Sequence, residues 1–184
     1  MTEIQSDVEL TAVREGHRFD ERRLEAYLQD HVDGFSGTLA IRQFEGGQSN
    51  PTFQLEAGGQ RYVMRKQPPG ELLPSAHMVD REYRVMAALA DTPVPVPKMF
   101  CLCEDLDIIG TKFYVMEMVA GRVYTETTLP SQTPEARRAI YLDLARVLAE
   151  LHKVDINAGG LESFGKPGNY YQRQFGRWSK QYLA

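Results

Sequence analysis

The chain has 184 residues, enough for one ordinary domain or one and a half small ones, and its hydrophobic and charged fractions, 42% and 25%, are those of a globular protein. The net charge of -4 argues against a nucleic-acid partner or an anionic membrane surface, which usually requires a basic stripe. Residues 1–20 lack the apolar core of a signal peptide, and no apolar run approaches the about 18 residues that span a bilayer. We therefore expect a soluble, cytoplasmic protein.

The first predicted elements are a helix and three strands. Residues 1–19 are expected to form a mobile lead-in, and Asp20 to cap a helix through Val32. The apolar stripe of this helix consists of Leu24, Tyr27, Leu28 and Val32. Strands at 38–44, 52–57 and 60–67, separated by turns at Gly46-Gly47 and Gly58-Gly59, predict an antiparallel meander. The first strand alternates Leu39, Ile41 and Gln43 with Ala40, Arg42 and Phe44.

A second helix and two more strands follow. The helix is expected from about Ser75 to Ala90, with Glu82 on its buried side. That side is formed by Val79, Tyr83, Met86 and Ala90. The proline-rich segment 92–97 must be extended, because each proline restricts its own φ and the residue before it. Strands at 98–104 and 111–119, joined by a turn at 105–110, complete a five-stranded sheet.

The last third of the chain is helical. Ala120-Gly121 marks a joint, and Thr133 caps a helix from Pro134 to about Lys153. Its apolar face consists of Ile140, Leu144, Val147, Leu148 and Leu151. Another helix is expected over 170–183 and carries Trp178. The fold class is therefore α+β, a small mixed lobe followed by the beginning of a helical lobe.

The two cysteines, Cys101 and Cys103, lie in a β-like run, and we expect them on opposite faces of the strand, poorly placed to bridge each other. No Cys/His group at zinc spacing accompanies them. Two buried thiols in a reducing compartment are the prediction. The sequence identifies no partner for His17, His31 or His77.

The turn after the first strand is a candidate phosphate-binding loop. Glycines at 46 and 47 allow backbone N–H groups to approach phosphate oxygens closely, and Ser49, Asn50 and Thr52 add short hydrogen-bond donors. An ordinary hairpin turn is the alternative explanation of the glycines, since Gly-Gly between strands is common.

A cation on the strand after that turn strengthens the hypothesis. Arg65 and Lys66 occupy opposite faces of the strand, and alternation alone does not decide which of them faces an anion. Glu82, on the apolar side of the next helix, requires a cationic partner, and Arg65 is the nearest candidate in chain order. A surface pair with Arg81 or Arg84 is the alternative.

Several ordered motifs resemble those of the aminoglycoside phosphotransferase-like kinases, in particular the branch found alone or fused to acyl-CoA dehydrogenases. The motifs are REYRVM at 81–86, TPVPVP at 92–97, GTKFYVMEMVAG at 110–121 and LAELH at 148–152. The resemblance covers about residues 35–184. It implies a lead-in and helix over 1–34, a protein-kinase-like N-lobe over 35–116, a hinge at 117–121 and the first helices of a C-lobe over 122–184.

The resemblance also implies ATP or GTP with Mg²⁺ and a set of nucleotide-binding residues. Arg65 would hold the α- and β-phosphates with Glu82 as its partner, Val63 would line the adenine pocket, and Met116 to Val119 would form the hinge. The full set is Gly46, Gly47, Gln48, Ser49, Asn50, Thr52, Val63, Arg65, Glu82, Met116, Glu117 and Met118.

Two departures from the family pattern matter. Arg65 stands where most kinases have lysine, although arginine fits this branch and can hold phosphate bidentately. The family's His-x-Asp motif with a later Asn, and the Asp that holds magnesium, do not occur in residues 1–184. No catalytic or metal-ligating residue is therefore assigned, and the chain by itself is expected to be inactive.

Two hypotheses about function remain open. In the first, the chain is part of a phosphotransferase that moves the γ-phosphate of ATP or GTP to a hydroxyl of a small molecule, more plausibly a hydroxyacyl or hydroxyacyl-CoA compound than an aminoglycoside. In the second, it is a non-catalytic nucleotide-binding or interaction module, whose exposed helix faces a homodimer or another partner would cover. An acyl-CoA dehydrogenase activity is not expected, because nothing in the sequence resembles a flavin site.

Overall fold

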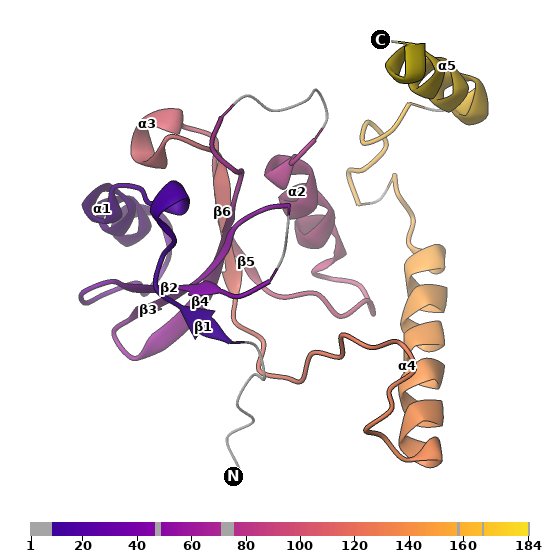
Figure 1. The fold of residues 1–184 in the computed structure, drawn as a ribbon, viewed down its shortest axis with the longest axis horizontal. Helices are drawn as coiled ribbons and strands as arrows, with labels where there is room; N and C mark the ends of the chain where they lie inside the picture. The colour runs from indigo at the N-terminus through magenta and orange to yellow at the C-terminus, as the bar shows by residue number, and fades with distance from the viewer. Residues whose placement is uncertain (1–8, 47–48, 71–75, 158, 167, 184) are drawn as a thin grey trace. The chain divides into compact units, whose positions relative to one another are not determined.

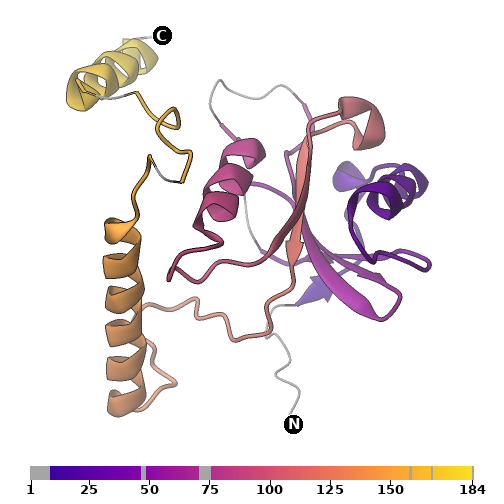
Figure 2. The same cartoon turned by 180° about the vertical axis from the view of Figure 1, so that it is seen from behind.

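The computed structural model describes residues 9–46, 49–70, 76–157, 159–166 and 168–183 (Figure 1). The chain divides into two compact units, residues 1–153 and 154–184. The first unit contains an antiparallel sheet with helices on both of its faces (Figures 1 and 2). The α+β class is confirmed, whereas the predicted boundaries at 34, 116 and 121 remain predictions.

The sheet has six strands in the order β1-β2-β3-β4-β6-β5, with all neighbours antiparallel. Five of them confirm the predicted strands. The bounds are Leu10–Thr11 for β1, Ala40–Phe44 for β2, Thr52–Ala57 for β3, Gln60–Lys66 for β4, Met99–Cys103 for β5 and Phe113–Glu117 for β6.

The sixth strand corrects the prediction of a mobile lead-in for the described part of residues 1–19, whereas residues 1–8 lie outside the described residues. Leu10 and Thr11 pair with Phe44 and Gln43, and a short 3₁₀ helix, η1, follows at Glu15–His17. The buried amide of Gln43 holds this segment, because its Oε1 accepts from the N–H of Arg14 at 3.1 Å and its Nε2 lies 2.8 Å from Nδ1 of His17. A two-residue strand has no period to recognise, so the sequence pattern does not reveal it.

Helix α1, Glu21–His31, covers one face of the sheet and forms as predicted. Asp20 caps it, since its Oδ1 accepts from the N–H groups of Arg22 and Arg23, both at 3.0 Å. Leu24 and Leu28 are fully buried. Their stripe packs on the inward residues of three strands: Phe53 and Leu55 of β3, Met64 of β4, and Phe113 and Val115 of β6.

The predicted turn at 105–110 contains a single helical turn, α3, at Leu106–Ile109. Asp105 caps it through the N–H of Asp107 at 2.9 Å, and Gly110 ends it at φ 81°, a left-handed conformation that glycine adopts without strain. Arg23 of α1 donates to the carbonyl of Asp107 at 2.8 Å, which ties the two helices together on the same face of the sheet.

Cys101 and Cys103 lie on the same face of β5, so the prediction of opposite faces is wrong. They are two positions apart, and a strand returns to the same face every second residue. Both are free thiols in the core under α1 and α3. Burial is the main reason that the pKa of the Cys101 thiol is raised to about 12, so this thiol stays protonated and unreactive at neutral pH.

Helix α2, Val79–Leu89, lies on the other face of the sheet (Figure 2). Its predicted start at Ser75 falls outside the described residues. Val79 is buried, as predicted, but Ala90 is exposed and Leu89 takes the inward position. The N–H of Ala90 bonds to the carbonyl of Ala87 three residues back, so the last turn is tighter than an α-helix and shifts the inward side by one residue.

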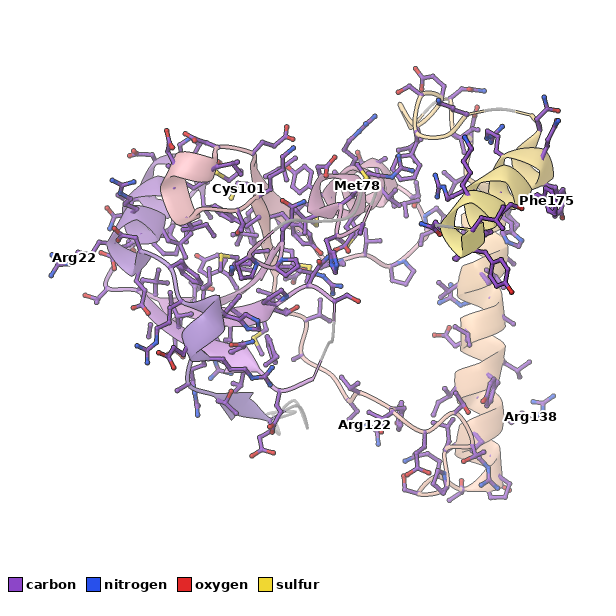
Figure 3. All side chains as sticks on the ribbon, turned by 45° about the horizontal axis from the view of Figure 1, so that its top comes forward. Arg22, Met78, Cys101, Arg122, Arg138 and Phe175 are labelled. Atoms are coloured by element: carbon purple, nitrogen blue, oxygen red, sulfur yellow. The ribbon has the colours of Figure 1, made fainter. Side chains whose placement is uncertain are left out.

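Helices α4, Pro134–Lys153, and α5, Tyr170–Leu183, confirm the two predicted C-terminal helices. Thr133 caps α4, because its Oγ1 accepts from the N–H of Ala136 at 3.2 Å. Neither helix buries a described side chain, and the predicted apolar face of α4 is largely exposed. Phe175, for example, projects from α5 (Figure 3). None of the helices in the described part of the chain combines the length and apolarity needed to cross a membrane.

Candidate nucleotide-binding site

The register of the sheet gathers several predicted site residues on the face that α2 covers. Arg65 of β4 lies opposite Thr52 of β3 and Tyr114 of β6, and Val63 lies opposite Met116. Paired residues of antiparallel strands point to the same face, so these five side chains lie on one face of three strands. The part of the site that carries Arg65 is thus built on a rigid sheet.

Arg65 and Glu82 form the predicted ion pair. Nε of Arg65 lies 3.0 Å from Oε2 of Glu82, and both side chains are about one third exposed, at 34% and 35%. The buried Nε has no hydrogen-bond partner among the described residues, so its N–H does not point along the line to the carboxylate and the contact is mainly electrostatic. Because the pair is only partly shielded from water, an approaching anion can reach it.

Lys66 faces the other way. Its side chain is 2% exposed and its ammonium lies 5.8 Å from the ring centroid of Phe19, on the face that packs against α1. Burial lowers the pKa of this amine. The structure therefore separates the two candidate cations, with Arg65 on the face of Glu82 and Lys66 in the core.

Glu82 is held from several sides. Its Oε1 accepts from Nδ2 of Asn50 at 3.0 Å, and its Oε2 accepts from the hydroxyl of Tyr114 at 2.9 Å. Burial, with the neighbouring Glu82 carboxylate as the next cause, raises the pKa of Tyr114 above its usual range, so this hydroxyl remains a donor. Oδ1 of Asn50 lies 2.9 Å from Nδ1 of His77. These side chains make a connected network around the carboxylate.

The candidate loop is described in part. Gly46 is exposed at φ 102°, which requires glycine, and Ser49 is exposed as well. Thr52 is half-buried, and its Oγ1 donates to the carbonyl of Asn50 at 3.2 Å, so its hydroxyl is engaged within the loop exit. Gly47 and Gln48 lie outside the described residues.

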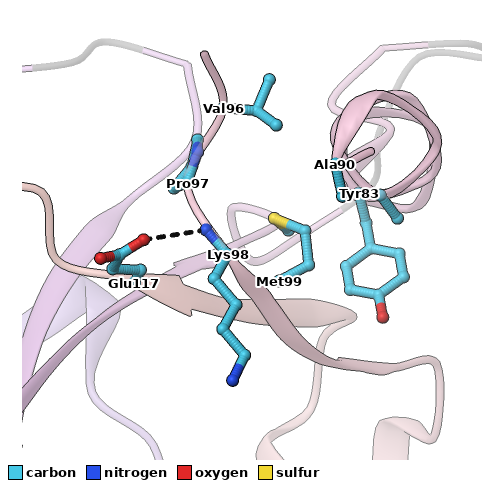
Figure 4. Close-up of a pocket in the computed structure, with 8 residues that line it drawn as sticks. Tyr83, Ala90, Val96, Pro97, Lys98, Met99 and Glu117 are labelled. Carbon is cyan, nitrogen blue, oxygen red and sulfur yellow. Dashed lines mark hydrogen bonds between the residues drawn. The ribbon is translucent and has the colours of Figure 1, made fainter. Parts of the chain in front are cut away.

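The predicted hinge residues Met116 and Glu117 end β6, and Met118 follows. Glu117 is tied to the edge of the sheet: its N–H donates to the carbonyl of Lys98 at 2.8 Å, and its Oε2 accepts from the N–H of Lys98 at 3.1 Å (Figure 4). The side chain at this position is therefore engaged with backbone.

A pocket of about 370 Å³ lies beside the hinge, between the C-terminal half of α2 and the beginning of β5 (Figure 4). Of the predicted site residues only Glu117 lines it. Its lining consists of Tyr83, Ala87, Ala90, Val96, Pro97, Lys98, Met99 and Glu117. The Arg65–Glu82 pair is not part of this pocket, so the predicted phosphate site and the pocket are separate features.

Comparison with known proteins identifies the family. The sequence model of the "Phosphotransferase enzyme family" matches residues 40–184, which is most of the chain. The chain belongs to this phosphotransferase family. The expectation of a kinase-like phosphotransferase fold, drawn from the motifs, is confirmed.

The relatives of this phosphotransferase chain agree. A protein of Ralstonia eutropha, assigned to the aminoglycoside phosphotransferases, has a crystal structure that matches with a TM-score of 0.77 and 53% identity, over 90% of this chain and 48% of that one. The probable acyl-CoA dehydrogenase IBR3 of Arabidopsis thaliana is 50% identical over 95% of this chain, and human acyl-CoA dehydrogenase family member 11 is 47% identical over 96%. The chain spans only 22% and 23% of the lengths of these two relatives.

The residues present fit the phosphate groups of a nucleotide better than they fit a metal ion. The planar guanidinium of Arg65, partly exposed on a rigid strand, can donate to two phosphate oxygens at once. Within the described ranges, no cluster of three or more His, Cys, Asp or Glu side chains could hold a metal ion. We therefore assign no magnesium ligand within these ranges.

His77 and Tyr114 join the site although sequence reasoning did not select them. Tyr114 is two positions from Met116 on a predicted strand, and strand alternation would have placed it on the hinge face. No comparable signal exists for His77, because its contact joins residues 27 positions apart, and nothing in the local pattern brings them together.

Proposed function

We propose that this chain binds the triphosphate of ATP or GTP beside Arg65 and forms the nucleotide-binding part of a phosphotransferase that acts on a hydroxyl group of a small molecule. The observation that carries the proposal is the ion pair of Arg65 with Glu82, one third exposed, on the face where Thr52, Val63 and Met116 gather. Membership of the phosphotransferase family supports the reaction class.

Arg65 has donors to spare for phosphate. A guanidinium carries five N–H donors in a rigid fork, and the contact with Glu82 engages its Nε side. Strand alternation places Arg65 on this face of β4, and Glu82 contacts the guanidinium while leaving about a third of the side chain exposed. Val63, at the buried neighbouring position on that face, offers apolar surface for the base, and Met116 stands opposite it.

The reaction is an in-line displacement at the γ-phosphorus. The bond from this phosphorus to the bridging oxygen of the β-phosphate breaks and the nucleoside diphosphate leaves, while a bond to the hydroxyl oxygen of the acceptor forms and the hydroxyl proton passes to solvent. Arg65 acts on the donor side, where it balances phosphate charge and orients the chain of phosphates. Magnesium would arrive with the nucleotide and would supply further positive charge beside the phosphates, and no described residue is assigned as its ligand.

The acceptor that we favour is a hydroxyacyl compound, free or as its CoA thioester. Its support is the names of two relatives, one a probable acyl-CoA dehydrogenase and the other an acyl-CoA dehydrogenase family member. An aminoglycoside is the weaker candidate, and it rests on the Ralstonia eutropha protein.

Arg65→Ala is expected to abolish the stabilisation by Mg-ATP or Mg-GTP in a thermal shift measurement, whereas the unchanged chain gains stability with at least one of them. The change removes the cation that the phosphates require. Arg61→Ala is the matched control, because Arg61 lies on the same strand and face but at its exposed end.

Two outcomes would contradict nucleotide binding at Arg65. One is an unchanged chain that neither nucleotide stabilises. The other is an Arg65→Ala variant that keeps the full shift. Because this chain by itself is expected to be inactive, phosphoryl transfer is followed in a longer chain that carries the family's His-x-Asp motif, by ³¹P NMR with Mg-ATP and a hydroxyacyl-CoA, a free hydroxy acid or an aminoglycoside. Binding without transfer to any of them in that longer chain would favour the non-catalytic nucleotide-binding module.

A further inference from the structure

We propose that Asn50 and His77 are positioning residues for the phosphate-binding cation: together they hold the Glu82 carboxylate in the place where it orients Arg65. This inference rests on the proposed function for its relevance to nucleotide binding. The arrangement itself can be tested without nucleotide. Asn50 lies at the exit of the candidate loop, directly before β3, and is 4% exposed.

The direction of each hydrogen bond follows from chemistry. The Glu82 carboxylate only accepts, so the atom of Asn50 that faces it at 3.0 Å must be the amide nitrogen. The amide oxygen then faces Nδ1 of His77 at 2.9 Å, and Nδ1 must carry the proton. The result is a relay in which His77 donates to Asn50 and Asn50 donates to Glu82.

The relay joins three elements that carry the site. Asn50 belongs to the loop exit, His77 lies directly before α2, and Glu82 lies in the first turns of α2. The carbonyl of His77 accepts from Nε2 of Gln67, at the end of the strand that carries Arg65, and from the N–H of Val79, both at 3.0 Å. The loop, the helix and the cation strand are therefore tied at one point.

The backbone conformation of His77 indicates that surrounding contacts fix this residue in place. Its φ of 55° is left-handed, a conformation that costs energy for a residue other than glycine and that persists where surrounding contacts fix it. The two hydrogen bonds to its carbonyl are such contacts. This conformation presents Nδ1 to Asn50.

The relay fixes the position of Arg65 through the two oxygens of the Glu82 carboxylate. Among the described donors, Asn50 binds one oxygen, and Tyr114 and Arg65 contact the other. Asn50 holds Oε1, so that Oε2 remains directed at Arg65 and Tyr114. Without the amide, the Glu82 carboxylate can rotate about its last bond, and Arg65 loses its fixed counter-charge. Asn50 therefore acts on the phosphates through Glu82 and Arg65.

The first test compares Asn50→Leu with Gln43→Met. Both changes remove a buried amide that bonds to a histidine Nδ1, but Gln43 lies on the opposite face of the sheet. The readouts are the NMR signal of the Arg65 Nε–H group in the chain without nucleotide and the Kd for Mg-ATP. We expect Asn50→Leu to move the Arg65 signal and to weaken binding about tenfold, and Gln43→Met to leave both close to the parent.

The second test uses His77 in case Asn50→Leu fails to fold. His77→Leu should move the Arg65 signal, and His77→Asn should restore it, since the Asn amide places a donor near the position of Nδ1 and tolerates positive φ. His17→Leu is the matched control, because His17 bonds to Gln43 in the same way.

The outcomes separate the inference from the proposed function. If the parent binds neither Mg-ATP nor Mg-GTP, the proposed function fails, and the Arg65 signal without nucleotide still decides the role of Asn50 and His77. If the Arg65 signal responds to Asn50→Leu and His77→Leu no more than to Gln43→Met and His17→Leu, the relay does not position the cation and the inference is overturned.

Discussion

Neighbouring residues of β4 show how strongly a one-residue step changes the environment of a cation. Arg65 meets a carboxylate and partial solvent, whereas Lys66 is buried beside Phe19 among apolar side chains. Among the described residues no acidic side chain forms an ion pair with Lys66. Burial without a counter-charge disfavours the ammonium, and this is why the pKa of Lys66 is lowered.

Lys66→Met is therefore expected to stabilise the protein at pH 7 by about 1–3 kcal/mol. Methionine has nearly the same side-chain volume as lysine, and the change removes the cost of burying the charge. Urea unfolding measures the difference. The gain should shrink as the pH rises towards the ordinary lysine pKa of about 10.4, since the folded state loses the Lys66 proton before the unfolded state does.

The control for this change is Lys98→Met. Lys98 also lies over an aromatic ring, that of Phe100 at 5.2 Å, but it is exposed, so its replacement should change the stability by no more than about 0.5 kcal/mol. A loss of stability in Lys66→Met would contradict the argument and would show that the ammonium takes part in a favourable contact.

Two helices begin at a capping residue close in sequence, and the buried apolar side chains that follow the cap fix one of them on the sheet. Helix α1 begins where Asp20 offers a side-chain acceptor, and its Leu24 and Leu28 then fall on the sheet. Helix α4 begins in the same manner at Thr133. In contrast, β1 depends on the buried Gln43 of another strand and has no local signal of its own.

Asp20→Ala should lower the free energy of unfolding by about 1 kcal/mol, because the N–H groups of Arg22 and Arg23 lose their acceptor. Asp20→Asn keeps an acceptor and should cost clearly less. Chemical unfolding followed by circular dichroism measures both. Equal losses in the two variants would contradict the cap and would point instead to the charge of Asp20 at the helix N-terminus, or to its contact with Arg23, as the stabilising factor.

At the scale of the whole molecule, apolar surface is distributed unevenly. The sheet, α1 and α3 enclose a continuous core, whereas α4 leaves Leu144, Leu148 and Leu151 exposed by 61%, 50% and 41%. The aromatic side chains of α5 are exposed as well, Trp178 among them. Apolar faces of this kind bind hydrophobic dyes and favour association.

Replacing Leu144, Leu148 and Leu151 together by Gln should lower the fluorescence of a hydrophobic dye bound to the chain and reduce its self-association, with little change in thermal stability. The reason is that these side chains contribute little buried surface to this structure. The double replacement of Arg138 and Lys153 by Gln on the same helix serves as the control. Unchanged dye binding, with a marked loss of stability, would mean that the leucines are buried in solution.

The motifs at 81–86 and 110–121 predict the family, and hydrophobic periodicity with turn and cap residues predicts the order of the elements. The roles assigned to single residues in nucleotide binding stay predictions. Periodicity gives no signal for the strand at Leu10–Thr11, and the faces that it predicts for Ala90 and the two cysteines are wrong.

The sequence by itself determined the features that depend on neighbours along the chain. Periods of two and 3.6 residues, caps such as Asp20 and turns such as Gly58-Gly59 act within a few positions, so β3, β4, α1 and α4 can be predicted from their own residues. The family resemblance already implied the ion pair of Arg65 with Glu82. Only the tertiary structure decided that Lys66 enters the core and that Asn50 links His77 to Glu82. The two hydrogen bonds of Asn50 join residues 27 and 32 positions apart, and such pairs meet only when the sheet register and the packing of α2 bring their side chains together.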